Sequence, residues 1–315
     1  MSPADPVVSA LHEGMRRFLA LVAGIRPDLH RYCARMTGSV ADGEDIVQDT
    51  LARAYYALSE MESVPELRPW LFQIAHNRAL DHLRRYERRM SEPLDSVVDS
   101  ALSSSSDPEE RLAREQATQA AISRFVELVP LQRSALILKD VLGHSLTEVA
   151  QLLSITEPAA KAALHRGRVR LQALAAVSPE ARPSPPVSVS PGVARYVALF
   201  NARDWDGVRA LLAEDVRLDL VSRAKRTGRE VASYVERYSQ KSDWYMTPGT
   251  LDGREVILVF RTPSGVTQRV AGAHARPGYF IELQFAGERV TMIRDFRYVP
   301  YILAEASGLM WLPPA

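Results

Sequence analysis

The chain is 315 residues long, and at about 150 residues per domain this length predicts two or three domains. A composition of 46% hydrophobic and 24% charged residues is typical of a globular protein and excludes a wholly disordered chain. The formal net charge of +1 does not by itself suggest a nucleic-acid partner, but the charges are segregated along the chain, and the local blocks are more informative.

The sequence also lacks the signals of membrane insertion and export. No apolar run approaches the roughly 18 residues that span a bilayer, and the first residues lack a basic region followed by an apolar stretch. Cys33 is the only cysteine, which rules out an intrachain disulfide and a cysteine-based metal site. We therefore expect a cytoplasmic protein without membrane contact, metal or cofactor, in which Cys33 is a small buried side chain.

Two segments have the composition of linkers. Residues 91–110, SEPLDSVVDSALSSSSDPEE, are rich in Ser and Asp and show no sustained hydrophobic period. Residues 178–192, SPEARPSPPVSVSPG, contain five prolines, which prevent a helix from continuing. The linkers divide the chain into three modules, which we place at residues 10–90, 111–177 and 193–315.

The first module contains a helix with one acidic edge. Residues 43–58, GEDIVQDTLARAYYAL, have the apolar spacing of an amphipathic helix. The apolar face consists of Ile46, Val47, Leu51, Ala54, Tyr55 and Leu58. The other edge carries Asp45, Gln48 and Asp49. Residues 40–66 hold seven acidic residues and one arginine, a net charge of −6, which favours a partner of opposite charge.

The next predicted helix, in residues 66–89, becomes basic toward its end. Its inward side chains are expected to be Trp70, Leu71, Ile74, Leu80 and Leu83. Residues 66–90 contain six arginines and three acidic residues, a net charge of +3. Arginines near the end of a helix also interact favourably with the helix dipole, by about 0.3–1 kcal/mol each, so this block alone does not establish DNA binding.

Residues 145–171 predict two short helices around a tight turn. Ser145 and Glu148 have the spacing of a capping box at the start of the first helix, and Thr156 can cap the second. The second helix is expected to turn one set of side chains outward, namely Lys161, Ala162, His165 and Arg168, flanked by Ala163 and Arg166. Such a helix can enter the major groove of DNA; a helical hairpin with solvated basic residues is the alternative.

Taken together, these helical segments resemble a bacterial sigma factor of the extracytoplasmic-function (ECF) group of the sigma-70 family, over residues 15–175. Residues 41–58 resemble the family's helix that binds core RNA polymerase, residues 68–89 its promoter-melting and minus-ten helix, and residues 128–171 its minus-thirty-five domain. The resemblance implies two all-α domains, a region 2 helical bundle and a region 4 helix-turn-helix, whose partners are core RNA polymerase and promoter DNA.

The resemblance also assigns roles to residues. It implies that Asp45, Gln48 and Asp49 dock on the clamp coiled coil of the largest polymerase subunit. The minus-ten contacts that it implies are Trp70, Asn77, Arg78, Arg84, Arg85 and Arg88. The loop before Trp70 would form the pocket for an extruded base, with Asn77 beneath it, and the arginines would contact phosphates. An ordinary core position for Trp70 is the alternative.

For the minus-thirty-five element, the implied contacts are Lys161, His165, Arg166 and Arg168. Family members commonly have a polar residue and an arginine where this chain has Ala162 and Ala163. Because each bidentate base contact contributes about 1–3 kcal/mol of discrimination, we expect this helix mainly to anchor the DNA backbone.

The third module alternates helix-like and strand-like segments, and residues 192–300 resemble a SnoaL-like domain related to polyketide cyclases. The resemblance implies an α+β cone with a curved antiparallel sheet and an internal pocket. Candidate pocket residues are Asp219, Trp244, His274, Tyr279 and Asp295, with Trp205 as a further wall. We expect this domain to regulate the sigma modules, with a small-molecule ligand as a candidate partner, rather than to catalyse a reaction.

Two other functions are compatible with parts of the sequence. A stand-alone helix-turn-helix regulator would need neither the acidic helix nor the helix of residues 66–89. A SnoaL-like isomerase or hydrolase with a DNA-binding appendage would use pocket residues for proton transfer. The apolar end of the chain, which contains Met310, Trp311 and Leu312, is expected to pack either on its own domain or on the sigma modules.

Overall fold

The structure is a computed structural model, and it describes residues 6–90, 122–176, 189–241, 243–261, 276–306 and 309–311. The chain divides into two compact units, residues 1–181 and 182–315, each with a hydrophobic core of its own. The predicted linker at 91–110 and most of the one at 178–192 lie outside the described residues.

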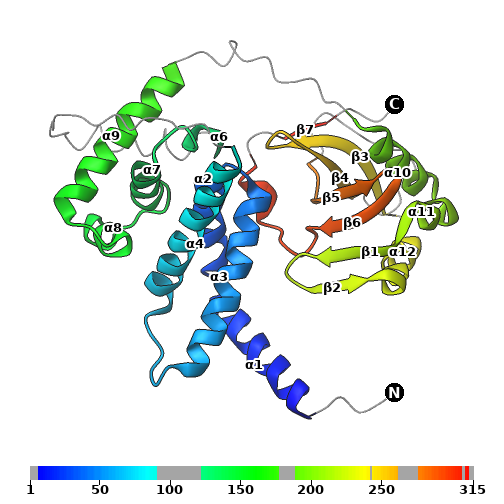
Figure 1. Ribbon diagram of the computed structural model, residues 1–315, viewed down its shortest axis with the longest axis horizontal. Helices are drawn as coiled ribbons and strands as arrows, with labels where there is room; N and C mark the ends of the chain where they lie inside the picture. Colours follow the sequence, from blue (N-terminus) through cyan, green and yellow to red (C-terminus); the bar gives the residue numbers. More distant parts are fainter. Residues whose placement is uncertain are drawn as a thin grey trace. The chain divides into compact units, whose positions relative to one another are not determined.

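The first unit is helical throughout its described residues (Figure 1). Its elements are α1 (Pro6–Val22), α2 (Arg26–Thr37), α3 (Val40–Glu60), α4 (Leu67–Met90), α6 (Ile122–Phe125), α7 (Pro130–Leu136), the π-helical turn η1 (Ile137–Val141), α8 (Leu146–Leu153) and α9 (Glu157–Ala176). Helices α2, α3 and α4 pack side by side, and α9 packs on α7 and α8.

Local sequence signals explain where several of these helices begin and end. Gly38 ends α2 with a φ of 75°, a conformation that favours glycine, and Ser39 then caps α3 by accepting a hydrogen bond from the Asp42 amide. The predicted capping box is confirmed, because Ser145 Oγ accepts the Glu148 amide at 3.2 Å and the Glu148 carboxylate accepts the Ser145 amide at 2.6 Å.

The helices of the first two predicted modules share one hydrophobic core. Buried side chains of α2, α3 and α4, Cys33 among them, are continuous with those of α7, α8 and α9. Polar contacts also join α2 to α7. The Tyr32 hydroxyl lies 3.2 Å from Ser134 Oγ, and the Arg133 guanidinium donates to the main-chain carbonyl of Met36. The core of the first unit therefore includes both helical modules.

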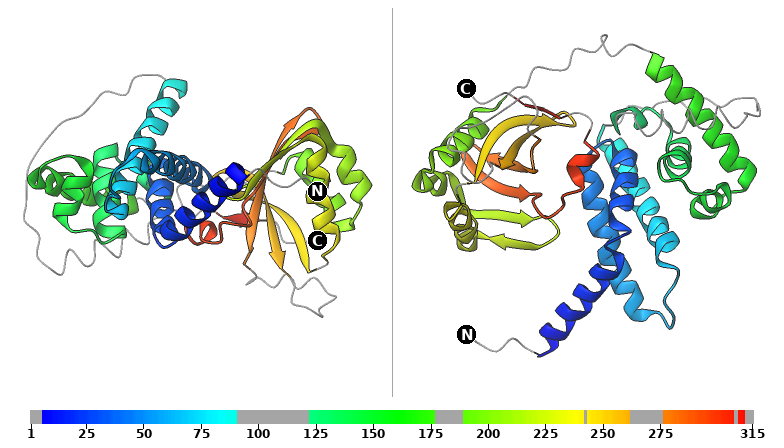
Figure 2. Two further views of the ribbon diagram at one scale, coloured as in Figure 1. Left: turned by 90° about the horizontal axis from the view of Figure 1, so that it is seen from below. Right: turned by 180° about the vertical axis from the view of Figure 1, so that it is seen from behind.

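The second unit is α+β. Its elements are α10 (Pro191–Ala202), α11 (Trp205–Leu211), β1 (Leu212–Leu220), β2 (Ala224–Thr227), η3 (Gly228–Val231), α12 (Ala232–Ser239), β3 (Trp244–Leu251), β4 (Arg254–Arg261), β5 (Tyr279–Ala286), β6 (Arg289–Asp295), η4 (Ile302–Ala304) and β7 (Met310–Trp311). The helices α10, α11 and α12 lie on one side of a curved sheet, and their apolar side chains meet those of the strands in the second core (Figure 2).

The expected α+β fold with a curved sheet is confirmed, and the sheet is mixed rather than purely antiparallel. Its strand order is β2-β1-β6-β5-β4-β3-β7, and β1 pairs with β6 in parallel, while the other pairs are antiparallel. Parallel pairing requires a long connection, which the chain between β1 and β6 provides. A turn at Asp252 and Gly253 joins β3 to β4, with φ values of 52° and 76°, as a two-residue hairpin requires.

The described part of the apolar tail packs on its own domain. Met310 and Trp311 form β7, which pairs with β3, and the Trp311 ring lies 5.9 Å from the Phe260 ring. Of the two expectations for this apolar tail, the structure therefore supports packing within the second unit for these residues. Leu312 lies outside the described residues.

Candidate polymerase and nucleic-acid interfaces

The acidic candidates on α3 face outward. Asp45 is exposed, and Gln48 and Asp49 are partly exposed. The opposite side of the helix buries Ile46, Val47, Leu51 and Ala54. The Asp49 carboxylate is paired twice, with Arg53 Nε at 3.2 Å on its own helix and with Arg78 Nε at 2.5 Å on α4. The acidic side of α3 is thus directly bonded to α4.

Arg78 therefore lies at the boundary between two predicted sites. Its side chain is 19% exposed, and it also donates to Asp81 at 2.8 Å. Three other minus-ten candidates on α4 are more open to solvent. Asn77, Arg84 and Arg85 are exposed, and Arg85 donates to the main-chain carbonyl of Asp81. The Arg88 side chain lies outside the described residues.

Trp70 is partly buried and also lines a surface groove. Its ring is partly buried and packs against the hydrophobic core of the first unit. The same side chain lines a groove of about 290 Å³ between the start of α4 and α8. The lining residues are Glu66, Arg68, Pro69, Trp70, Gln73, His144, Glu148, Gln151 and Leu152. The predicted base pocket contributes Glu66 and Arg68 of its loop, and Trp70, to this groove, but Asn77 is not among the lining residues.

The helix-turn-helix forms as predicted. Thr156 Oγ1 accepts the Ala159 amide at 3.3 Å at the start of α9. On α9, Lys161 and Arg166 are exposed and His165 is partly exposed. Ala163 was expected to flank the outward face, but it is fully buried in the core, so its small size is required by packing.

Arg168 points toward the supporting helices. Its Nε donates to Asp140 Oδ2 at 2.8 Å, and a terminal nitrogen donates to Oδ1 at 2.7 Å. The Asp140 side chain is 0% exposed, and that of Arg168 is 13% exposed. Of the four predicted minus-thirty-five contacts, the structure therefore presents three at the surface and gives the fourth a partner inside the protein.

A histidine lies at the junction of the two helical modules. His76 Nδ1 of α4 is 2.7 Å from the Tyr32 hydroxyl and 3.4 Å from Ser134 Oγ. Burial lowers the pKa of His76 from 6.5 to about 4, so the ring is neutral at physiological pH. A second histidine, His144, packs edge-on against Phe72, and burial also lowers its pKa. Sequence periodicity gave no signal for this junction, because it joins residues 44 to 102 positions apart.

In the second unit, two of the five candidate pocket residues meet in one buried cluster. The Asp295 carboxylate accepts hydrogen bonds from the hydroxyls of Tyr234 and Tyr238, at 3.1 and 3.2 Å. The Tyr279 hydroxyl lies 2.8 Å from that of Tyr238, and the Arg297 guanidinium contacts both Asp295 and Tyr279. Burial raises the pKa of Asp295, and Arg297 partly opposes this shift.

The remaining pocket candidates are distributed differently. The Trp244 ring packs edge-on against Tyr238, 5.0 Å away, so it borders the cluster. Asp219 instead lies 3.8 Å from Arg294, which also pairs with Glu282. Arg294 and Asp295 are neighbours on β6, and successive strand residues point to opposite faces. His274 lies outside the described residues.

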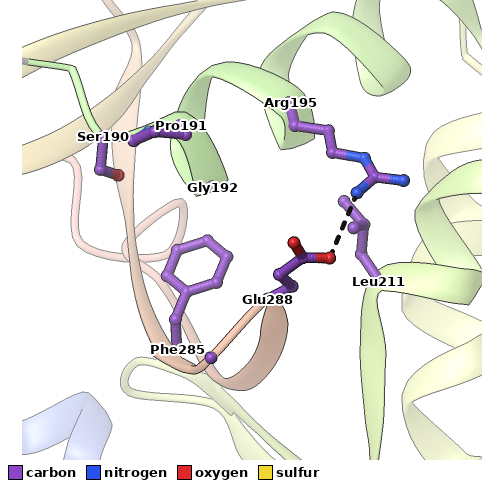
Figure 3. Close-up of a pocket in the computed structure, with 8 residues that line it drawn as sticks. Ser190, Pro191, Gly192, Arg195, Leu211, Phe285 and Glu288 are labelled. Carbon is purple, nitrogen blue, oxygen red and sulfur yellow. Dashed lines mark ion pairs between the residues drawn. The ribbon is translucent and has the colours of Figure 1, made fainter.

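The second unit also has a surface pocket that the sequence did not predict. This pocket, of about 360 Å³, lies between the start of α10 and the β5–β6 turn (Figure 3). It is lined by Ser190, Pro191, Gly192, Arg195, Leu211, Phe285, Gly287 and Glu288. Phe285 forms an apolar wall, and Arg195 and Glu288 form an ion pair at 3.8 Å on the rim. None of the four predicted pocket residues that the structure describes lines it.

The described residues show neither a metal-binding cluster nor a membrane-spanning helix. They contain no group of three or more His, Cys, Asp or Glu side chains that could hold a metal ion. Among these same residues, no helix has both the length and the apolar character needed to cross a membrane.

Comparison with known proteins identifies the helical modules as parts of the sigma-70 family. The family model for Sigma-70 region 2 matches residues 21–89, and the model for Sigma-70 region 4 matches residues 120–171. These ranges contain α2, α3, α6, α7 and α8, together with α4 up to residue 89 and α9 up to residue 171.

Curated relatives specify the group. The ECF RNA polymerase sigma factor SigF of Caulobacter vibrioides is 34% identical, and the match covers 54% of this chain and 87% of SigF. SigG of Mycobacterium tuberculosis is 33% identical, with 60% of this chain and 57% of SigG covered, so the chain spans little more than half of SigG's length. The chain belongs to the ECF sigma factors.

Solved structures were also compared. The crystal structure of the Mycobacterium tuberculosis extracytoplasmic function sigma factor SigJ is 22% identical, covers 88% of this chain and 95% of that chain, and gives a TM-score of 0.34. A putative ketosteroid isomerase from Kribbella flavida is 26% identical over 33% of this chain and 73% of that chain, with a TM-score of 0.24.

Proposed function

We propose that the chain binds core RNA polymerase and directs it to promoters, where it helps to open the DNA. In this proposal residues 10–90 form region 2 and residues 111–177 form region 4. The α3 face with Asp45, Gln48 and Asp49 docks on the clamp coiled coil of the largest polymerase subunit. As a subunit of the transcription machinery, the protein acts in the cytoplasm.

DNA contacts are divided between two helices. On α4, Asn77 and Trp70 take part in holding single-stranded bases, while Arg84, Arg85 and Arg88 contact phosphates, and Arg78 does so where its ion pair with Asp49 opens. On α9, the candidates Lys161, His165 and Arg166 anchor the minus-thirty-five DNA. The observation that carries the proposal is the exposure of an acidic face on α3 beside an exposed Asn77 and arginines on α4, in a chain of the ECF family.

Transcription by reconstituted enzyme tests this function. Purified core polymerase and the full chain are given a fragment library of genomic DNA from the source bacterium, and specific run-off transcripts are sequenced. An Asp45→Asn, Asp49→Asn double variant is expected to lose most transcripts and most binding to core polymerase, because the docking face loses its charge. Glu60→Gln, an exposed acid at the end of the same helix, is the matched control. A folded wild-type chain that yields no specific transcript would contradict the proposal.

We further propose that residues 193–315 regulate the sigma modules and do not catalyse a reaction. The carboxylate of Asp295 supports this, because two tyrosine hydroxyls and Arg297 occupy it inside the protein, which leaves it poorly placed to accept a substrate proton. The pocket beside Phe285 is the candidate site for a small-molecule ligand of this domain.

A truncated chain tests regulation. Because the second unit has its own core, a chain that ends near Ser178 should keep the core of the first unit. The truncated and full-length proteins are expected to differ in transcript yield or in affinity for core polymerase. Identical behaviour in both assays would contradict a regulatory role.

A further inference from the structure

The buried ion pair between α9 and η1 suggests how the helix-turn-helix is held in place. Arg168 donates two hydrogen bonds to the two carboxylate oxygens of Asp140, at 2.8 and 2.7 Å. A two-point pair of this kind fixes orientation as well as distance. Because the Asp140 carboxylate is fully buried, its charge needs this partner, since an unpaired buried charge is strongly unfavourable.

The surroundings of Arg168 are those of a packing contact. Leu164 and Leu171, one turn to either side of it on α9, are both buried. At Gly167, an added Cβ would lie 3.1 Å from the main-chain oxygen of Gln132, so α9 approaches α7 closely at this point. Arg168 therefore lies at the line of contact between α9 and its supporting helices, although its spacing from Lys161 and His165 also fits the outward face.

Asp140 lies in an irregular turn among the helices that support α9. The turn η1 is π-helical, so its hydrogen bonds lack the regular pattern of α7, with which it is continuous. The ion pair between this turn and α9 therefore links the direction of α9 to the geometry of the turn.

We infer that Asp140 and Arg168 are positioning residues, which fix the direction of α9 against η1, and that Arg168 makes no contact with DNA phosphates. This inference rests on the proposed function of α9 as a DNA-contacting helix. It removes one cation from the predicted DNA face and leaves Lys161 and Arg166 as the charged contacts of that set.

The salt dependence of DNA binding separates the two roles of Arg168. The full-length chain is titrated with a random-sequence duplex of about 30 base pairs at several salt concentrations. Binding weakens as salt rises, and the slope is taken here as the magnitude of the fall in log K per unit of log salt. Each phosphate contact adds about 0.9 to this slope. The matched control is Arg166→Met, an exposed arginine two positions earlier on α9. It is expected to lower the slope by about 0.9.

The key variant replaces both partners by apolar side chains, Asp140→Leu with Arg168→Met. Because no charge is then left buried and unpaired, this variant is expected to keep the wild-type slope and an affinity within about twofold. Each single substitution is expected to weaken binding by about tenfold or more. A double variant whose slope falls as far as that of Arg166→Met would overturn the inference, whether or not the single variants fold.

Amide hydrogen exchange gives a second readout that does not depend on DNA. Each single substitution is expected to speed exchange by about tenfold in both η1 and α9, and the double variant should restore it. If each substitution disturbs only its own helix, the pair does not position α9. If wild type and Arg166→Met have equal slopes, the proposed DNA contact of α9 fails, and the exchange measurement still tests the pair.

Discussion

The junction between the two helical modules should weaken in acid, because His76 is buried there as a neutral ring. Its pKa is lowered from 6.5 to about 4, so the folded chain binds fewer protons than the unfolded chain between these values. Stability is therefore complete above about pH 6.5 and falls as the pH is lowered toward 4. Between pH 7.5 and pH 5, His76 is expected to lower the free energy of unfolding by about 2 kcal/mol. Its whole contribution, reached well below pH 4, is about 3 kcal/mol.

The perturbation is His76→Asn, since the Asn side chain cannot titrate in this range but can still accept a hydrogen bond from the Tyr32 hydroxyl. Urea unfolding of the full chain is measured at both pH values, with a signal that reports on the first unit. On acidification, the free energy of unfolding of the wild type should fall by about 2 kcal/mol more than that of the variant. The control is Gln73→Asn, on the exposed side of the same helix. Equal pH dependence of wild type and His76→Asn would refute the reasoning.

Three further predictions concern stability, each measured by denaturant unfolding. Gly43→Ala should destabilise the first unit by about 1–3 kcal/mol, because the new Cβ would lie 2.6 Å from the main-chain nitrogen of Ala34; an unchanged midpoint would show that α2 and α3 separate easily. Ser145→Ala should remove about 1 kcal/mol by deleting the cap of α8, and Ser145→Asp should retain most of it. Gly253→Ala should destabilise the second unit by about 1–2 kcal/mol because its φ is 76°, and a neutral effect would contradict the hairpin geometry.

Local signals predicted much of this fold from the sequence. The capping box at Ser145 and the apolar stripe of α3 depend on residues close together in the chain, and both are confirmed. Long-range pairing was not predictable in this way. The parallel contact of β1 with β6 joins segments separated by four other strands, and no local pattern of side chains specifies it.

The candidate sites show the same division. Periodicity placed Lys161 and Arg166 on the surface of α9, and they are exposed. It also placed Arg168 on that surface, because this residue lies three positions after His165. Arg168 also lies four positions after the buried Leu164, so helical spacing alone does not decide which way its side chain faces. Only the position of Asp140 on a different helix decides which way the arginine turns. The bond between Asp49 and Arg78 escaped prediction for the same reason, since it joins α3 to α4.

The face of α9 has a consequence for promoter choice under the proposed function. With Ala163 in the core and Arg168 bonded to Asp140, the outward candidates are Lys161, His165 and Arg166. Lysine and arginine bind phosphates at any sequence, whereas discrimination requires paired hydrogen bonds to base edges. A helix with so few groups for paired hydrogen bonds to base edges is better suited to anchoring the DNA backbone than to distinguishing base sequences. Selection between promoters then depends more on α4, where Asn77 is exposed and its amide has both a donor and an acceptor for a base.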